Sequence, residues 1–269
     1  MKSELPLSKS RRNAFDVARQ AAMDAGTIIM SRFSMRKDIS FKSEGKNNIV
    51  TDVDILAEKT IREQLLKEYP DYGIISEESK EIKGKAPYKW IVDPLDGTRN
   101  YAYGIPHFCV CIALTQGDDV ILGMIYDPVR DELFHAEKGQ GSYLNGEPIY
   151  VTKRSSLTEA LISCDMGYNP DNSRKYIDIY SNLWSNVTTT RLMGSAALGI
   201  AYTACARLDL YFHVSLYPWD IASGILLVRE AGGVARTLSG EPAAYNKKDI
   251  LVSNRKIADD FLHTVTKRG

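Results

Sequence analysis

Acidic residues stand at three points of the chain where one pattern of residues gives way to the next. Glu77 and Glu78 follow a strand-like run, Asp93 and Asp96 follow another, and Asp220 stands where a helical run begins. Taken singly, each has an ordinary structural explanation, because acids cap helices and occupy surface turns. Taken together, clustered carboxylate oxygens are the ligands that Mg²⁺ prefers. The three points therefore predict a magnesium site if the fold brings them together.

The segment at residues 93–98, with the sequence DPLDGT, carries the strongest signal of the three. Its proline fixes the path between the two aspartates, so both can point at one position from a tight turn. The carbonyl of Leu95 can serve as a further oxygen ligand, and Gly97 lets the backbone approach a bound group because it has no Cβ. Thr98 adds a hydroxyl, and a helix that starts here offers free N–H groups to a phosphate. Carboxylates alone would repel that phosphate, so the segment predicts phosphate chemistry that depends on a divalent cation.

The elements that must position these residues follow from the apolar periodicity of the chain. Helices are expected over residues 11–33, 52–69, 174–184, 196–206, 220–231 and from 256. Strands are expected over residues 73–76, 90–92, 108–115, 120–126, 132–136, 142–150, 161–164, 187–191, 208–212 and 250–252, with a hairpin turn at Asn145-Gly146. The polar residues 36–48 predict a loop. The first half therefore indicates helices over an antiparallel-rich sheet, and the second half indicates α/β packing.

The length of 269 residues predicts one compact enzyme with two lobes. We expect residues 1–152 to form an N-terminal α+β lobe with most of the metal ligands. Residues 153–269 are expected to form a C-terminal α/β lobe with Asp220 and the substrate pocket.

The composition is that of an ordinary globular protein, with 44% hydrophobic and 25% charged residues. Basic and acidic residues number 34 each, so the net charge of zero predicts neither a nucleic acid nor a membrane surface as partner. The polar N-terminus predicts no signal peptide, and no apolar run approaches the length of a membrane span. The Cys109 and Cys111 pair is expected in a buried strand, a thiol metal site being the alternative. Four scattered, reduced cysteines suit the cytoplasm.

Other chemistries find weaker support in the sequence. The run from Asp52 to Leu56 resembles the nucleophile motif of haloacid dehalogenases, but Leu56 breaks that motif and the run begins a helical pattern. Gly139-Gln140-Gly141 lies in a hairpin pattern and lacks the rest of a dinucleotide fingerprint. The sequence has no GxSxG elbow, no cysteine followed six residues later by arginine, and no HxxxH or HExxH spacing. These absences argue against serine, cysteine and zinc hydrolases.

Several blocks of the chain, in order and over nearly its whole length, resemble the inositol monophosphatase family of the fructose-1,6-bisphosphatase-like superfamily. The blocks that carry the resemblance are residues 50–54 with Glu58, 75–79, 90–101, 194–197, 219–224 and 230–233. The resemblance implies an α+β fold, layered as an α-β-α-β-α sandwich of the sugar phosphatase type. It also implies a magnesium-dependent, lithium-sensitive phosphatase that forms a homodimer.

The resemblance assigns roles to residues of this chain, with two or three Mg²⁺ in each active site. The positions that match the family's metal ligands are Glu77, Asp93, the carbonyl of Leu95, Asp96 and Asp220. Of the pair Glu77 and Glu78, the match favours Glu77. Thr98 matches the residue that orients the attacking water, and the N–H groups of Gly97 and Thr98 match those that hold the phosphate. Lys42 matches a loop lysine near the site, and Asp54 matches an acid behind the metal ligands or, equally, is a first-turn helix acid.

Recognition of the substrate is the point where the chain departs from the family pattern. Gly194, Ser195 and Ala196 are expected to line the pocket, because small residues let the backbone approach a polyol. Inositol enzymes of the family carry a glutamate seven residues before the WD aspartate, and His213 stands there in this chain. Histidine can donate as well as accept, although it is also an ordinary strand residue.

The substrate is therefore expected to be a small phosphorylated polyol or sugar. Inositol 1-phosphate comes first, hydrolysed by in-line attack of a metal-activated water without a phosphoenzyme. The alternatives are a broader sugar phosphatase, acting on fructose 1,6-bisphosphate for example, and a histidinol-phosphatase. A nucleotide 3′-phosphatase has less support, because the chain has no additional lobe or basic insertion. A regulatory binding protein is a further alternative, although every metal-site acid is present.

Overall fold

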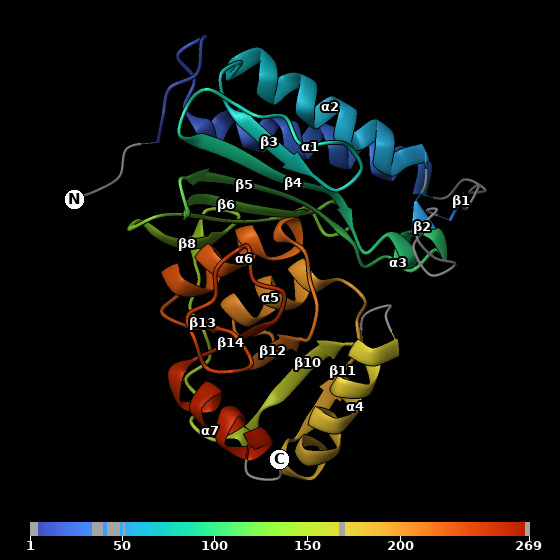
Figure 1. Cartoon of the computed structure of the whole chain (residues 1–269), viewed down its shortest axis with the longest axis vertical. Coiled ribbons are helices and arrows are strands. Elements are labelled where there is room, and N and C mark those ends of the chain that lie inside the picture. The colour runs from blue at the N-terminus through green and yellow to red at the C-terminus, as the bar shows by residue number, and fades with distance from the viewer. Residues whose placement is uncertain (1–4, 34–39, 42–48, 51, 167–169, 267–269) are drawn as a thin grey trace.

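The structure is a computed structural model that describes residues 5–33, 40–41, 49–50, 52–166 and 170–266. It stacks helices and sheets in five layers (Figure 1). Within the described residues, no helix is long and apolar enough to cross a membrane.

The helices and strands have the following bounds. The α-helices are α1 (Ala14–Phe33), α2 (Asp52–Glu68), α3 (Thr98–Ala102), α4 (Pro170–Leu183), α5 (Ala196–Ala204), α6 (Pro218–Glu230) and α7 (Arg255–Thr266), with short 3₁₀ helices η1 (Leu157–Glu159) and η2 (Trp184–Asn186). The strands of the first half are β1 (Ser40–Phe41), β2 (Ile49–Val50), β3 (Gly73–Ser76), β4 (Tyr88–Asp96), β5 (Cys109–Gln116), β6 (Asp119–Asp127), β7 (Glu132–Glu137), β8 (Gly141–Leu144) and β9 (Glu147–Pro148). Those of the second half are β10 (Leu161–Asp165), β11 (Thr189–Arg191), β12 (Leu210–His213), β13 (Val234–Arg236) and β14 (Ile250–Ser253).

Two sheets form the second and fourth layers. The larger has seven strands in the order β3 to β9 and is antiparallel except where β3 pairs with β4. The smaller has five strands in the order β11-β10-β12-β14-β13, with β10 parallel to both of its neighbours. Helices α1 and α2 cover the outer face of the larger sheet, α5 and α6 lie between the sheets, and α4 and α7 cover the outer face of the smaller one (Figure 1). The expected α-β-α-β-α sandwich is confirmed.

A row of small residues lets α6 lie close to the larger sheet. Ala113, Gly123 and Ala136 are neighbours on β5, β6 and β7. A Cβ on Gly123 would stand 2.5 Å from the carbonyl oxygen of Ser223 on α6. A similar contact joins α5 to the smaller sheet, where a Cβ on Gly199 would meet the ring of Tyr211 at 2.5 Å. These contacts set how close α5 and α6 lie to the two sheets. They therefore also position the residues at the N-termini of these two helices.

Several element boundaries differ from those expected. The first helix begins at Ala14 instead of residue 11, because the side chain of Asn13 accepts the N–H of Asp16 at 2.8 Å and caps it. The strand expected over 142–150 is two short strands, β8 and β9, with the turn at Asn145-Gly146 between them. Strand β13, which has three residues, was not predicted. Of the expected loop 36–48, the structure describes only Ser40–Phe41, which pair with Ile49–Val50, and Lys42 lies outside the described residues.

Candidate active site

A bulge at the end of β4 turns Asp93 and Asp96 to the same face of the larger sheet. Residues three apart on a regular strand point to opposite faces. Here Asp93 pairs with Cys111 and Asp96 with Cys109, so β4 carries one residue more than β5 between the two pairs. The N–H of Leu95 donates to Oδ1 of Asp93 at 2.9 Å and holds the turn. The DPLDGT segment thus places both carboxylates on the side of the sheet that faces α5 and α6.

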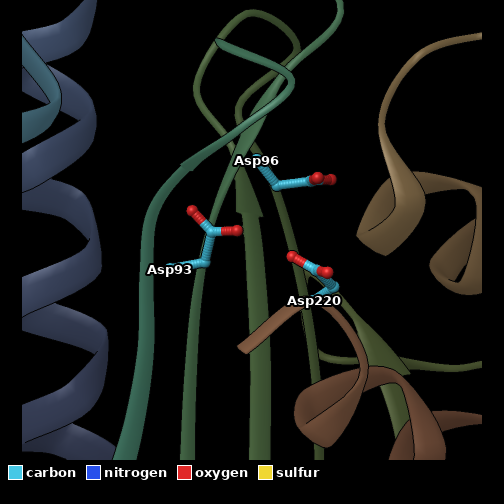
Figure 2. A group of neighbouring side chains, drawn as sticks. All are labelled: Asp93, Asp96 and Asp220. Atoms are coloured by element: carbon cyan, nitrogen blue, oxygen red, sulfur yellow. The ribbon is translucent and has the colours of Figure 1, made fainter. Parts of the chain in front are cut away.

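Helix α6 brings Asp220 to the same place from the far end of the chain. Its Oδ2 accepts the N–H of Tyr217 at 2.7 Å, so the side chain caps the first turn of α6. Figure 2 shows Asp93, Asp96 and Asp220 converging, and one carboxylate oxygen of each lies within 4.8 Å of the others. Asp220 therefore caps α6, as the structural explanation expected, and it is also a member of the carboxylate cluster.

The three carboxylates lie in surroundings that oppose their charge. Burial raises the pKa of Asp93 well above its ordinary value, and the nearby charges of Glu77 and Asp96 raise it further. Burial likewise raises the pKa of Asp96, although hydrogen bonds from Ser195 and Ala197 lower it in part. Burial and the charge of Asp96 raise the pKa of Asp220. Asp93, Asp96 and Asp220 form no ion pair with a lysine or arginine of the described residues.

Two buried acids of α2, one helical turn apart, hold the segments around the cluster. Oδ1 of Asp54 accepts the hydroxyl of Thr98 at 3.1 Å, a hydroxyl that also lies 3.0 Å from the carbonyl oxygen of Leu95. Oε2 of Glu58 accepts the N–H of Glu78 at 2.7 Å and so fixes the chain at Glu77. Asp54 therefore contacts Thr98 and also lies in the first turn of α2, a geometry that is compatible with both interpretations of this acid.

The segment 193–197 closes the site on the side of the smaller sheet. The hydroxyl of Ser195 and the N–H of Ala197 both donate to Oδ2 of Asp96, the latter at 2.9 Å. The side-chain amide of Asn100 donates to the carbonyl of Met193 at 2.7 Å. Asp96 at the end of β4 and Asn100 on α3 therefore hold this segment, and the expected pocket residues Gly194, Ser195 and Ala196 lie beside the cluster.

His213 lies at the end of β12 and is 4% exposed. Its Nδ1 accepts the N–H of Ser215 at 3.0 Å, and no hydrogen bond joins it to the carboxylates. Burial lowers the pKa of His213 to about 4, so the imidazole is neutral at pH 7. In a neutral ring whose Nδ1 accepts, the proton is on Nε2. The side chain is thus a donor at the position where the family's glutamate would accept.

Asp165, at the end of β10, was not among the predicted site residues. It neighbours His213 across the smaller sheet, and its Oδ1 accepts the N–H of Gly194 at 2.9 Å. Burial raises the pKa of Asp165 to about 6, and Asp96 is among the charges that contribute. The signal that could have found it is the one used for Asp93, an acid directly after a strand-like run.

The donor set fits a divalent cation. Buried like charges that no basic side chain neutralises are costly, and a cation held between them removes that cost. The atoms that converge are carboxylate oxygens, and hard cations such as Mg²⁺ prefer oxygen. The thiols of Cys109 and Cys111 are buried beside the aspartates and 3.8 Å apart.

Comparison with known proteins agrees with this geometry. Residues 10–268 match the inositol monophosphatase family model. The chain is 36% identical to an inositol-1-monophosphatase of Rhizobium meliloti, over 93% of this chain and 94% of that one. It is 37% identical to the Nus factor SuhB of Xylella fastidiosa, over 95% of each. The structure of the extragenic suppressor protein suhB from Bartonella henselae superposes with a TM-score of 0.91 at 37% identity, covering 95% of this chain and 99% of that one. The chain belongs to the inositol monophosphatase family.

Proposed function

We propose that this protein hydrolyses a small phosphate monoester with the help of Mg²⁺, and that inositol 1-phosphate is its first candidate substrate. Membership of the family makes it a phosphoric monoester hydrolase. The observation that carries the proposal is the convergence of Asp93, Asp96 and Asp220, which form no ion pair with a basic side chain of the described residues.

The residues proposed to hold two or three Mg²⁺ are Glu77, Asp93, the carbonyl of Leu95, Asp96 and Asp220. Bound there, Mg²⁺ would supply a more acidic water and offset the charge of the phosphoryl oxygens. The protein contributes the placement of these oxygens, through the bulge of β4 and the position of α6. Glu77 is partly exposed directly after β3, and the family resemblance implies that it also holds a third, weaker ion together with water.

Thr98 is proposed to orient the attacking water. Its hydroxyl can donate to Asp54 or to the carbonyl of Leu95, and its oxygen can then accept from a water. Gly97 has φ +94°, and a Cβ there would stand 2.9 Å from the carbonyl oxygen of His107. We propose that this conformation presents the N–H groups of Gly97 and Thr98 to the phosphate.

The leaving group is proposed to rest on residues 194–196 and His213. A donor at His213 suits a hydroxyl oxygen of inositol as well as a sugar oxygen, so the broader sugar phosphatase and the histidinol-phosphatase remain the alternatives. We also propose a homodimer, as the family resemblance implies. Ile177 on α4, Trp184 in η2 and Leu192 directly after the edge strand β11 are exposed and offer apolar surface for it.

Phosphate release from a panel of substrates tests this function. The panel holds inositol 1-phosphate, fructose 1,6-bisphosphate, histidinol phosphate, glycerol 2-phosphate and adenosine 3′,5′-bisphosphate, each with Mg²⁺ and with EDTA. We expect Mg²⁺-dependent release, fastest from inositol 1-phosphate and inhibited by Li⁺ at tens of millimolar. Release that persists in EDTA would contradict the metal assignment.

A partner-binding role is the second candidate. A relative 37% identical to this chain carries the name Nus factor SuhB, and regulatory binding was the non-enzymatic alternative from the sequence. Absence of Mg²⁺-dependent release from every compound of the panel would favour this candidate over catalysis.

A further inference from the structure

Asp165 brings a carboxylate to the wall that is proposed to face the leaving group. It ends β10, is partly exposed, and lies in register with His213 on the neighbouring strand β12. Its Oδ1 accepts the N–H of Gly194 at 2.9 Å, and its Oδ2 accepts the hydroxyl of Tyr211 at 3.3 Å. The two hydrogen bonds therefore hold the carboxylate beside Gly194, at one end of the segment 194–196.

This wall carries negative charge that no described basic residue offsets. The contacts of Asp165 are hydrogen bonds from neutral groups, and in the part of the chain that the structure describes no lysine or arginine forms an ion pair with it. His213 beside it is neutral at pH 7 and offers one N–H donor. Asp96 lies on the other side of the segment, bound to Ser195 and Ala197.

We infer that Asp165 determines substrate specificity, by favouring monophosphates whose leaving alcohol carries hydroxyl or ammonium donors and by disfavouring a second phosphate. The inference rests on the proposed function, because it assigns the wall of Gly194 and His213 to the leaving group. It predicts a preference between inositol 1-phosphate and fructose 1,6-bisphosphate, both of which are candidate substrates under the proposed function.

The selection follows from elementary electrostatics. A carboxylate accepts hydrogen bonds from hydroxyl groups and attracts an ammonium group, but it repels a phosphate dianion. Recognition of phosphate in proteins commonly uses arginine, lysine or a row of free N–H groups. At this wall the N–H of Gly194 is already taken by Asp165, and a single neutral imidazole donor does not offset a full negative charge.

A merely structural role for Asp165 makes a different prediction. If the carboxylate served only to hold Gly194 in place, removing a hydrogen bond to it would disturb every substrate alike. Tyr211→Phe removes the hydroxyl that donates to Oδ2 and leaves the charge of Asp165 in place. Asp165→Asn removes the charge and keeps a carbonyl oxygen that can accept from Gly194. The pair of variants therefore separates charge from position.

Competition between substrates tests the inference. For wild type, Asp165→Asn, Tyr211→Phe and the exposed helix variant Asp178→Asn, kcat/KM is measured with Mg²⁺ for inositol 1-phosphate, fructose 1,6-bisphosphate, glycerol 2-phosphate and 2-aminoethyl phosphate. In Asp165→Asn we expect the ratio of bisphosphate to inositol 1-phosphate to rise about tenfold, through KM. The ratio of 2-aminoethyl phosphate to glycerol 2-phosphate should fall by about the same factor. Both ratios should stay at the wild-type value in Tyr211→Phe and Asp178→Asn.

The possible outcomes are distinct. Unchanged ratios in Asp165→Asn, or equal changes in Tyr211→Phe, would overturn the inference while leaving the phosphatase intact. A wild type that prefers fructose 1,6-bisphosphate to inositol 1-phosphate would also overturn it. A wild type without Mg²⁺-dependent release from any compound would instead overturn the proposed function itself. Thermal unfolding of each variant confirms that the comparison is made on folded protein.

Discussion

Asp93 is buried and Asp220 is partly buried, and the surroundings of both disfavour the ionised carboxylate. Each has a pKa raised by burial and by neighbouring carboxylates, so each destabilises the folded protein when it ionises without a cation. Structures hold such groups at functional sites and lose stability by doing so. The same residues are therefore expected to control activity and stability in opposite directions.

Asp93→Asn and Asp220→Asn are the variants that test this at the residue scale. We expect each to lower kcat/KM at saturating Mg²⁺ by at least about a hundredfold, because a lost metal ligand removes several kcal/mol of charge stabilisation. In EDTA each variant should melt above wild type, by about 2–4 °C for each kcal/mol of repulsion removed. The measurements are phosphate release and thermal unfolding. Near-wild-type turnover in either variant would show that the residue is not a metal ligand.

At the scale of elements, the sequence predicts which strands and helices end at the site, but not the direction in which their side chains point. An apolar run followed by an acid predicted β3 and β4, and the periodic run after Trp219 predicted α6. The bulge between Asp93 and Asp96 depends on pairing with β5, so no local pattern shows it. The hydrogen bond from the N–H of Gly194 to Asp165 joins residues 29 apart, so no local pattern shows it either. Contacts of this kind arise from the packing of elements, and only residues that match a known family could be placed beforehand.

The position of Asp220 depends on how closely α6 packs against β6. Gly123→Ala would place a Cβ 2.5 Å from the carbonyl oxygen of Ser223 and push the helix from the sheet. We expect a loss of about 1–3 kcal/mol in the free energy of unfolding, as in other overpacked cores. The Mg²⁺ concentration for half-maximal activity should rise as well, because Asp220 moves with α6.

Gly146→Ala is the matched control for that prediction. Gly146 has φ +87° in the β8–β9 turn, and a Cβ there would meet nothing within 4 Å. The alanine should therefore cost stability through backbone strain alone and leave the Mg²⁺ requirement unchanged. An equal change of the Mg²⁺ requirement in both variants would mean that α6 does not transmit the effect.

At the scale of the whole molecule, the site joins parts of the chain that are far apart. Asp93 and Asp96 come from the larger sheet, Asp220 from the middle layer, and Asp165 with His213 from the smaller sheet. The proposed division into lobes at residues 152 and 153 would put proposed metal ligands on both sides of the boundary. A bound cation would then link the layers, so its effect should appear in the stability of the entire fold.

Unfolding measured against pH, with and without Mg²⁺, tests that link. The raised pKa values of Asp93, Asp96 and Asp220 mean that the folded state keeps protons that the unfolded chain has lost above about pH 4. Their contribution to stability therefore falls as pH rises through the folded pKa values. His107, His135 and His213, whose pKa values desolvation lowers to about 4, contribute in the opposite sense between about pH 4 and 6.5. The contribution of the histidines cancels in the difference in Tm between Asp93→Asn and wild type. In EDTA we expect this difference to be positive and larger at pH 8 than at pH 5.

Saturating Mg²⁺ should reverse the sign of this difference in Tm at pH 8, because wild type alone keeps every ligand. If the difference in Tm between Asp93→Asn and wild type changed with neither pH nor Mg²⁺, then Asp93 would neither carry an uncompensated charge nor bind the cation.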